Sequence, residues 1–169
     1  MRKFFRTMLC ALLLLTLTAS PLMATKSSVA QAAGTMKMVK VNVQGGRLRK
    51  GPGSSYDIIT SLDKGEKIFY SGKTKNAFSY VCTADGKSGY IYKEFLSNYG
   101  SVRSSSIYYT TGKNVRMYKK PSTSASRAAT LRKQQFVIVY KKAGKWAYVR
   151  TLDGQAGYIQ LSKLKNAGW

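Results

Sequence analysis

Few side chains in this sequence could carry out catalysis. The 169 residues include no histidine, which excludes a Ser-His-Asp or Cys-His arrangement. Cys82 lies on an expected strand with no neighbouring base, and we interpret it as a small core residue rather than a reactive thiol. The six carboxylates are too few for a convincing acid/base pair or metal cage. The sequence therefore predicts a protein that is not an enzyme and has neither a cofactor nor a metal site.

Aromatic side chains form a more informative pattern, because they alternate with small aliphatic residues. On one expected strand, Ala147 and Val149 are suited to point into a core. The outward residues of that strand are then Trp146, Tyr148 and Arg150. We take these three as candidate ligand-binding residues.

The same alternation predicts further outward rows. Phe78 and Tyr80 are the counterparts earlier in the chain, and Phe136 and Ile138 lie on the strand before Trp146. Such apolar rows are unusual on a solvent-facing surface. Two interpretations stay open: the rows pack two parts of the chain together, or they form a stacking platform for sugar rings or a peptide, with Trp146 as the first anchor.

Basic residues dominate the charge, with 29 Lys and Arg against 6 Asp and Glu. Residues 33–100 carry a net charge of +6, and residues 101–169 carry +13. In the second part, Lys119 and Lys120 follow Tyr118 in an expected turn, and turns at one end of a barrel can converge on a patch that attracts anions. We include these three among the candidate binding residues. A generally basic surface that only aids solubility is the alternative.

Two internal repeats organise the chain. The tripeptide Gly-Tyr-Ile begins at Gly89 and again at Gly157, 68 positions later. Nearer the start of each repeat, Leu48-Arg49 is similar to Val115-Arg116, at an offset that differs by one. We therefore expect the loop before Pro121 to hold one extra residue.

Each repeat predicts several short strands joined by tight turns and no helix. Asp85-Gly86 and Asp153-Gly154 fit hairpin turns, because both residue types tolerate positive φ angles. About sixty residues with five short strands must close on themselves or leave edges exposed. We therefore predict an all-β protein of two tandem small barrels. The predicted divisions are a first domain at 40–97, a Ser-rich linker at 98–106 and a second domain at 107–166.

Residues 1–32 are expected to be a cleaved export signal. A basic start precedes an apolar run from Met8 to Leu17 and the small-residue pattern Ala30-Gln31-Ala32. The run is too short to span a bilayer comfortably, and an uncleaved anchor is the alternative. Cleavage after Ala32 would leave a net charge of +19 and no transmembrane anchor.

The ordered motifs resemble the bacterial SH3-like (SH3b) family. They are Leu48-Arg49 before the Gly51-Pro52 turn, the Lys64-Gly65 turn, Gly144-Lys145-Trp146 before a valine strand, and Gly-Tyr-Ile before a final leucine in both repeats. One departure is Phe78, where the family usually has Trp. The resemblance implies two tandem SH3-like β-barrels that bind rather than catalyse.

The resemblance to this family points to a role at the bacterial cell wall. The resemblance implies a secreted, wall-associated protein whose partner is peptidoglycan or a teichoic-acid-like polyanion. A protein-interaction module, such as a regulator, inhibitor or adaptor of a secreted enzyme, is the alternative. Charge alone would permit nucleic acid as a partner, but the export signal argues against it. Because the second copy has the tryptophan and most of the charge, we expect that copy, or the seam between the copies, to contribute most of the binding.

Overall fold

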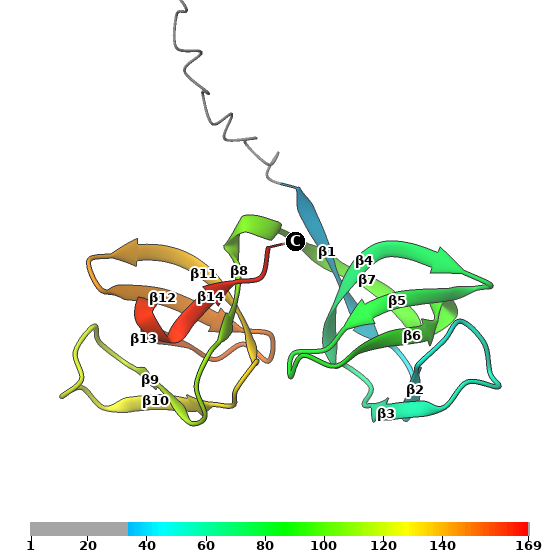
Figure 1. Cartoon of the computed structure of the whole chain (residues 1–169), viewed down its shortest axis with the longest axis horizontal. Helices are drawn as coiled ribbons and strands as arrows, with labels where there is room; N and C mark the ends of the chain where they lie inside the picture. Colours follow the sequence, from blue (N-terminus) through cyan, green and yellow to red (C-terminus); the bar gives the residue numbers. More distant parts are fainter. Residues whose placement is uncertain (1–33, 169) are drawn as a thin grey trace, which may run out of the picture.

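The computed structural model describes residues 34–168, which form two small β-barrels side by side (Figure 1). The predicted export signal, residues 1–32, lies outside the described residues. Within 34–168, no helix has the length and hydropathy needed to cross a bilayer. The prediction of an all-β chain with two tandem barrels is confirmed.

The first barrel is a seven-stranded antiparallel sheet in the order β3-β2-β6-β5-β4-β1-β7. Its elements are β1 Thr35–Val41, β2 Gly46–Arg49, β3 Ile58–Leu62, β4 Lys67–Lys75, β5 Phe78–Cys82, β6 Ser88–Tyr92, the 3-10 turn η1 Lys93–Phe95, and β7 Leu96–Arg103. The β-branched and aromatic content of these segments suits a pleated, half-buried surface.

The second barrel repeats this order as β10-β9-β13-β12-β11-β8-β14. A 3-10 turn, η2 Ser104–Ser106, leads into it. Its elements are β8 Ile107–Thr110, β9 Val115–Tyr118, β10 Arg127–Leu131, β11 Phe136–Ala143, β12 Trp146–Thr151, β13 Ala156–Gln160, the 3-10 turn η3 Leu161–Lys163, and β14 Leu164–Asn166.

Each barrel closes over its own apolar core. Alternate residues of every central strand point inward, as in β12, where Ala147 and Val149 are fully buried. The buried residues of the first core are Val39, Val41, Leu48, Leu62, Ile68, Val81 and Ile91. Those of the second are Val115, Met117, Leu131, Val137, Val139, Ala147, Val149 and Ile159.

The structure corrects how the two repeats align. Strands β2 and β9 begin 69 positions apart, as do β3 and β10, so Leu48 corresponds to Met117 and not to Val115. The loops after β2 and β9 have equal length, and the expected extra residue before Pro121 does not exist. The first barrel instead has one more residue in its β4–β5 hairpin, because β4 spans nine residues and β11 eight. Beyond that hairpin the offset is 68.

The predicted linker at 98–106 is also corrected. Residues up to Arg103 belong to β7, which pairs with β1 along its whole length, from Val41 opposite Leu96 to Thr35 opposite Arg103. Within residues 34–168, the chain passes from the first barrel to the second through η2 alone. The serine content that suggested a linker is compatible with this strand because β7 lies at the edge of its sheet, where side chains remain partly solvated.

A third apolar cluster joins the two barrels, and we call it the seam. It consists of Phe69 and Cys82 from the first barrel and Ile107, Phe136, Ile138 and Leu152 from the second. The rings of Phe69 and Phe136 meet edge-on, with centroids 5.8 Å apart. The amide of Phe136 donates a hydrogen bond of 2.8 Å to the carbonyl of Ala84, across the seam.

The seam has approximate two-fold character. Phe69 and Ile138 hold matching places in β4 and β11, and both face the seam. Each pairs with a matching neighbour, since Met38 lies opposite Phe69 and Ile107 lies opposite Ile138. The barrels therefore meet as the halves of a symmetric dimer would, although they belong to one chain.

The predicted outward positions of Phe136 and Ile138 are explained by this seam. Both residues do leave the core of their own barrel, as alternation requires, but they are 9% and 6% exposed because the first barrel covers them. For these two residues the packing interpretation is the right one. The Asp85-Gly86 and Asp153-Gly154 hairpin turns are confirmed, with positive φ at both glycines.

Candidate binding grooves

The first groove lies on the first barrel, where the β1–β2 turn, β2, β5 and the end of β6 meet. It has a volume of about 590 Å³, within the range of small-ligand sites. Its lining residues are Val43, Gln44, Gly45, Arg47, Arg49, Ser54, Phe78, Tyr92 and Phe95. Gly45 turns the chain with φ of +68°, which favours glycine.

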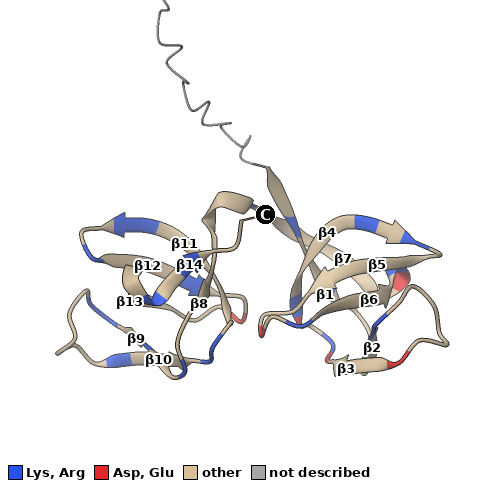
Figure 2. Ribbon diagram, viewed as in Figure 1, with Lys and Arg blue, Asp and Glu red and all other residues tan. Residues whose placement is uncertain are grey.

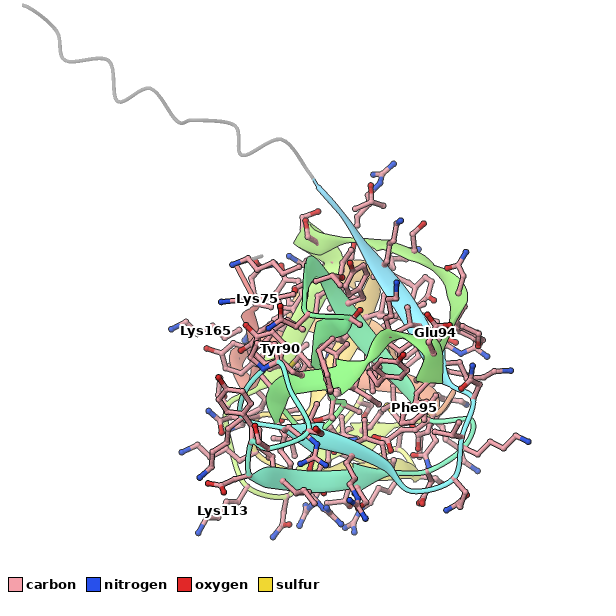
Figure 3. All side chains as sticks on the ribbon, turned by 90° about the vertical axis from the view of Figure 1, so that its right-hand side faces the viewer. Lys75, Tyr90, Glu94, Phe95, Lys113 and Lys165 are labelled. Atoms are coloured by element: carbon pink, nitrogen blue, oxygen red, sulfur yellow. The ribbon has the colours of Figure 1, made fainter. Side chains whose placement is uncertain are left out.

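Three aromatic rings form one wall of the first groove. Phe78 and Tyr92 lie on adjacent strands with ring centroids 5.7 Å apart, and Tyr92 meets Phe95 at 5.4 Å. Both contacts are edge-on, so the three rings form a continuous aromatic surface along this side of the groove. Tyr92 is 37% exposed. In the side-chain view, Phe95 lies next to Glu94 on η1 (Figure 3).

Two arginines complete the first groove. Arg47 is exposed, and Arg49 donates a hydrogen bond of 2.6 Å to the carbonyl of Tyr56 in the β2–β3 loop. The same loop is held by an ion pair of 2.9 Å between Lys50 and Asp57, and the hydrogen bond from Lys50 lowers the pKa of Asp57. A guanidinium beside aromatic rings suits a ligand that has both a carboxylate and an apolar or sugar part.

A second groove of about 300 Å³ occupies the same place on the second barrel. It is lined by Gly112, Lys113, Asn114, Val115, Arg116, Tyr118, Gln160 and Lys163. Seven of these positions correspond to lining positions of the first groove under the structural alignment. The chemistry differs, because Gln160 stands where the first barrel has Tyr92, and Lys163 where it has Phe95.

Both barrels match one known protein family. A family model described as the bacterial SH3 domain matches residues 44–97 and again residues 113–164. The chain belongs to the bacterial SH3 domain family. The two matched regions begin 69 positions apart, which agrees with the structural alignment of the two SH3 domains.

Two solved structures also resemble the chain, at low similarity. They are NlpC2 and NlpC1 from Trichomonas vaginalis, each at 14% identity and a TM-score of 0.32. The matches cover 77% and 82% of this chain, and 48% of each of the other two chains. At this TM-score they support no argument about function. No curated protein matches the chain.

Several of the predicted site residues meet in aromatic pairs on the outer face of the SH3 domains. Tyr118 and Trp146 meet edge-on at 5.7 Å, and Tyr148 pairs with Tyr158 across β12 and β13 at 5.1 Å. Tyr118 lines the second groove, and Trp146 packs against its ring. Tyr148 is 38% exposed.

The first SH3 domain has the equivalent of the Tyr148–Tyr158 pair, while Arg49 and Phe78 stand where the second has Tyr118 and Trp146. Tyr80 meets Tyr90 at 5.0 Å, and Phe78 lines the first groove. The outer face of each domain is therefore an aromatic strip that ends at its groove.

Other predicted residues lie apart from the grooves. Arg150 borders a cavity at the seam together with Met38 and Tyr99, and its Nε donates to the carbonyl of Gly154 at 3.3 Å. Lys119 and Lys120 are exposed in the β9–β10 loop and line neither groove. The structure thus divides the candidate residues between the two grooves, the aromatic strips, one loop and the seam.

Reactive groups are sparse in the described residues. Cys82 is 3% exposed at the seam, and burial raises the pKa of its thiol, which disfavours the nucleophilic thiolate. Within residues 34–168, no three His, Cys, Asp or Glu side chains are placed to hold a metal ion.

Sequence reasoning identified Phe78 among the nine lining residues of the first groove and Tyr118 among the eight of the second, and it missed the others. Tyr92 and Phe95 come from the end of β6 and η1, which follow the Gly-Tyr-Ile motif directly. The repeat itself held the signal, since the offset of 68 pairs these residues with Gln160 and Lys163, a change from aromatic to polar that stands out between otherwise similar copies.

Proposed function

We propose that this chain is a secreted, non-catalytic binder of the bacterial cell envelope, which holds peptidoglycan in its first groove. One observation carries the proposal: three aromatic rings and two arginines line a single groove of about 590 Å³. Peptidoglycan combines sugar rings, whose C–H faces stack on aromatic rings, with peptide carboxylates, which pair with guanidinium groups. Membership of the bacterial SH3 domain family supports a cell-wall-related role.

The charge distribution predicts that the second domain contributes most of the binding, but the groove residues favour the first domain for peptidoglycan. Positive charge is concentrated on the second domain, but the aromatic wall belongs to the first, and neutral sugars gain more from ring stacking than from net charge. We therefore assign the peptidoglycan contact to the first domain. The basic second domain raises the local concentration of the chain near an anionic envelope.

Sedimentation with purified cell walls, stripped of anionic polymers, tests the proposal. The chain without residues 1–32 should pellet with the walls at low salt. Tyr92→Ala and Arg47→Gln should each weaken this binding roughly tenfold, the scale expected for central contacts of an interface.

Two matched controls lie outside the groove. Tyr140→Ala removes a tyrosine that is 61% exposed, and Lys75→Gln removes a charge from the β4–β5 hairpin. Both should bind as the unaltered chain does. A chain that stays in the supernatant, or that instead captures one stoichiometric protein insensitive to wall digestion, would contradict the proposal and favour a regulator or adaptor.

A further inference from the structure

The second groove has the composition of an anion site. Lys113, Arg116 and Lys163 line it, with the amides of Asn114 and Gln160 beside them. None of the eight lining residues is acidic. Three cations around a cavity of about 300 Å³ would repel one another, so an anion that enters it relieves that repulsion as well as forming new contacts.

The acidic residues of the chain lie elsewhere. Asp153 is the single carboxylate of the second domain, and it borders a cavity at the seam together with Asp85 of the first. The other four belong to the first domain. In Figure 2 the red segments accordingly lie over the first barrel and at the two hairpin tips that face each other across the seam. The second groove therefore lies in a region of net positive charge.

The comparison with the first groove indicates the class of anion. Gln160 and Lys163 replace two of the three rings, so the apolar wall that suits sugars is lost. What remains are three cations, two side-chain amides and the ring of Tyr118 with no carboxylate, which suits an anionic ligand rich in hydrogen-bond acceptors. Phosphate is such a ligand, because arginine binds it through two N–H groups and lysine binds it as a point charge.

The neighbouring surface favours a polymer over a single phosphate. Lys119 and Lys120 lie exposed in the loop that follows β9, which itself forms part of the groove. A chain of phosphates held in the groove can reach further cations of this kind, and each additional contact raises the effective affinity.

The two grooves are separate, because they share no lining residue and belong to different barrels. Figure 1 shows these barrels side by side, and in Figure 3 Lys113 of the second groove lies at the lower left, apart from Phe95 of the first. The seam, through Phe69 and Phe136, holds this arrangement.

We propose that the second groove is a separate binding site for a phosphodiester-linked polymer of the envelope, so that the chain bridges two different polymers. Two parts of this proposal rest on the proposed function: that both polymers belong to the envelope, and that the first groove holds peptidoglycan. The groove's preference for phosphate rests on its own residues.

Binding of a fluorescent poly(glycerol phosphate) to the chain without residues 1–32 tests the site. The variant Lys113→Gln/Arg116→Gln/Lys163→Gln should lose at least tenfold in affinity, and the slope of log affinity against log salt should fall by roughly two to three. The control variant, Lys64→Gln/Lys73→Gln/Lys75→Gln, loses the same charge from exposed positions of the first domain and should change affinity less than twofold.

Three results would overturn this proposal. Equal losses in the two triple variants would show attraction to overall charge rather than to a site. An oligonucleotide of the same charge that binds as tightly, and with the same dependence on the groove cations, would show a general polyanion surface. Inorganic phosphate that displaces the polymer at equal phosphate concentration would show a site for the free ion.

A bridging assay separates this inference from the proposed function. Walls stripped of anionic polymers should carry labelled poly(glycerol phosphate) into the pellet only when the chain is present. The groove triple variant should pellet without the polymer. Tyr92→Ala should still bind the polymer but leave it in the supernatant, because this variant binds walls weakly. If the unaltered chain pellets without polymer, the inference fails and the proposed function stands. If it binds polymer in solution but never pellets, the proposed function fails and the phosphate site stands.

Discussion

The two SH3 domains share one fold but differ at two positions of the loop after β2 or β9 that contact each other in the first domain. In the first, the ring of Tyr56 packs so closely over Gly51 that a Cβ atom there would lie 2.3 Å from it. In the second, the corresponding residues are Lys120 and Ala125, so the side chain that Gly51 lacks is present and the ring is absent. The loops have the same length but differ in composition, since the first contains an aromatic ring and a Lys50–Asp57 ion pair and the second contains two lysines and no aromatic residue.

Acidic residues follow the same division. Asp63 and Glu66 of the first domain correspond to Arg132 and Gln135 of the second. Such surface positions contribute little to the stability of a barrel, so they can change while the core is retained. The comparison teaches that duplication here preserved the scaffold and diversified the surface around each groove.

The largest effect is expected at the seam that both domains share. Phe69→Ala should lower the free energy of unfolding by about 4 kcal/mol, because a fully buried aromatic ring is lost from a cluster built by both domains. Thermal unfolding should change from one transition to two. Calorimetry measures both quantities, and a single, unshifted transition would show that the domains fold without the seam.

The equivalence of the two barrels can be tested at matching glycines. A Cβ atom on Gly89 would lie 2.5 Å from the carbonyl oxygen of Arg49, and one on Gly157 would lie 2.7 Å from that of Tyr118. Gly89→Ala and Gly157→Ala should therefore each cost about 3 kcal/mol, measured by denaturant unfolding. Gly112→Ala is the control, since its nearest neighbour would be 3.6 Å away. A large cost at only one of the two sites would contradict the alignment.

Exchanging the residues at the corresponding positions 95 and 163 should make the ligand preferences of the two grooves more alike. Phe95→Lys should weaken binding to stripped walls roughly tenfold, about 1.4 kcal/mol, because the aromatic wall is broken. Lys163→Phe should weaken poly(glycerol phosphate) binding roughly threefold, since one of three cations is lost. Lys165→Phe, at an exposed position of β14, is the matched control and should change neither affinity. Unchanged affinities in both groove variants would remove the functional distinction between the grooves.

The smallest effect is expected where the domains differ by one charge near the seam. Burial raises the pKa of Glu66 above 4.5, so the folded state favours the protonated side chain. The stability this group contributes is full below the pKa of the unfolded glutamate and is lost as the pH rises through the higher folded value. Glu66→Gln should therefore stabilise the chain at pH 7 by about 0.5 kcal/mol, and this gain should vanish below about pH 4.

The second domain supplies the reason to choose glutamine. The carboxylate of Glu66 accepts a hydrogen bond from the amide of Asp63, and the side-chain oxygen of Gln135 accepts the same bond from Arg132. Glutamine keeps the turn while it removes the charge. Denaturant unfolding of both chains between pH 4 and 7 measures the difference, and a gain independent of pH would contradict the assignment to Glu66.

Local patterns predicted much of the fold. Alternation identified Ala147 and Val149 as core residues, and Asp-Gly identified both hairpin turns, because these features depend on neighbouring residues alone. The alignment of Leu48 with Val115 was wrong because a Leu-Arg or Val-Arg pair is too short to set register. Register was decided by contacts with β6 and β13, where Gly89 and Gly157 leave no room for a shifted strand.

The groove could be predicted only in part, for a related reason. Phe78 was identified as the counterpart of Trp146 on an alternating strand, and Tyr118 because it precedes the basic Lys119-Lys120 turn. Arg47 and Phe95 meet at the same groove although 48 positions separate them, and no local period relates a strand to a 3-10 turn that follows a different strand.

The sequence by itself determined the repeat, the strands, the turns and the uneven charge, since each follows from residue type and short spacing. The tertiary structure decided which outward faces meet solvent. Phe136 and Ile138 satisfy the same alternation as Trp146 and Tyr148, yet the first pair is buried in the seam and Tyr148 is exposed. Alternation assigns a side chain to a face of the sheet, and only the packing of one barrel against the other determines whether that face is covered.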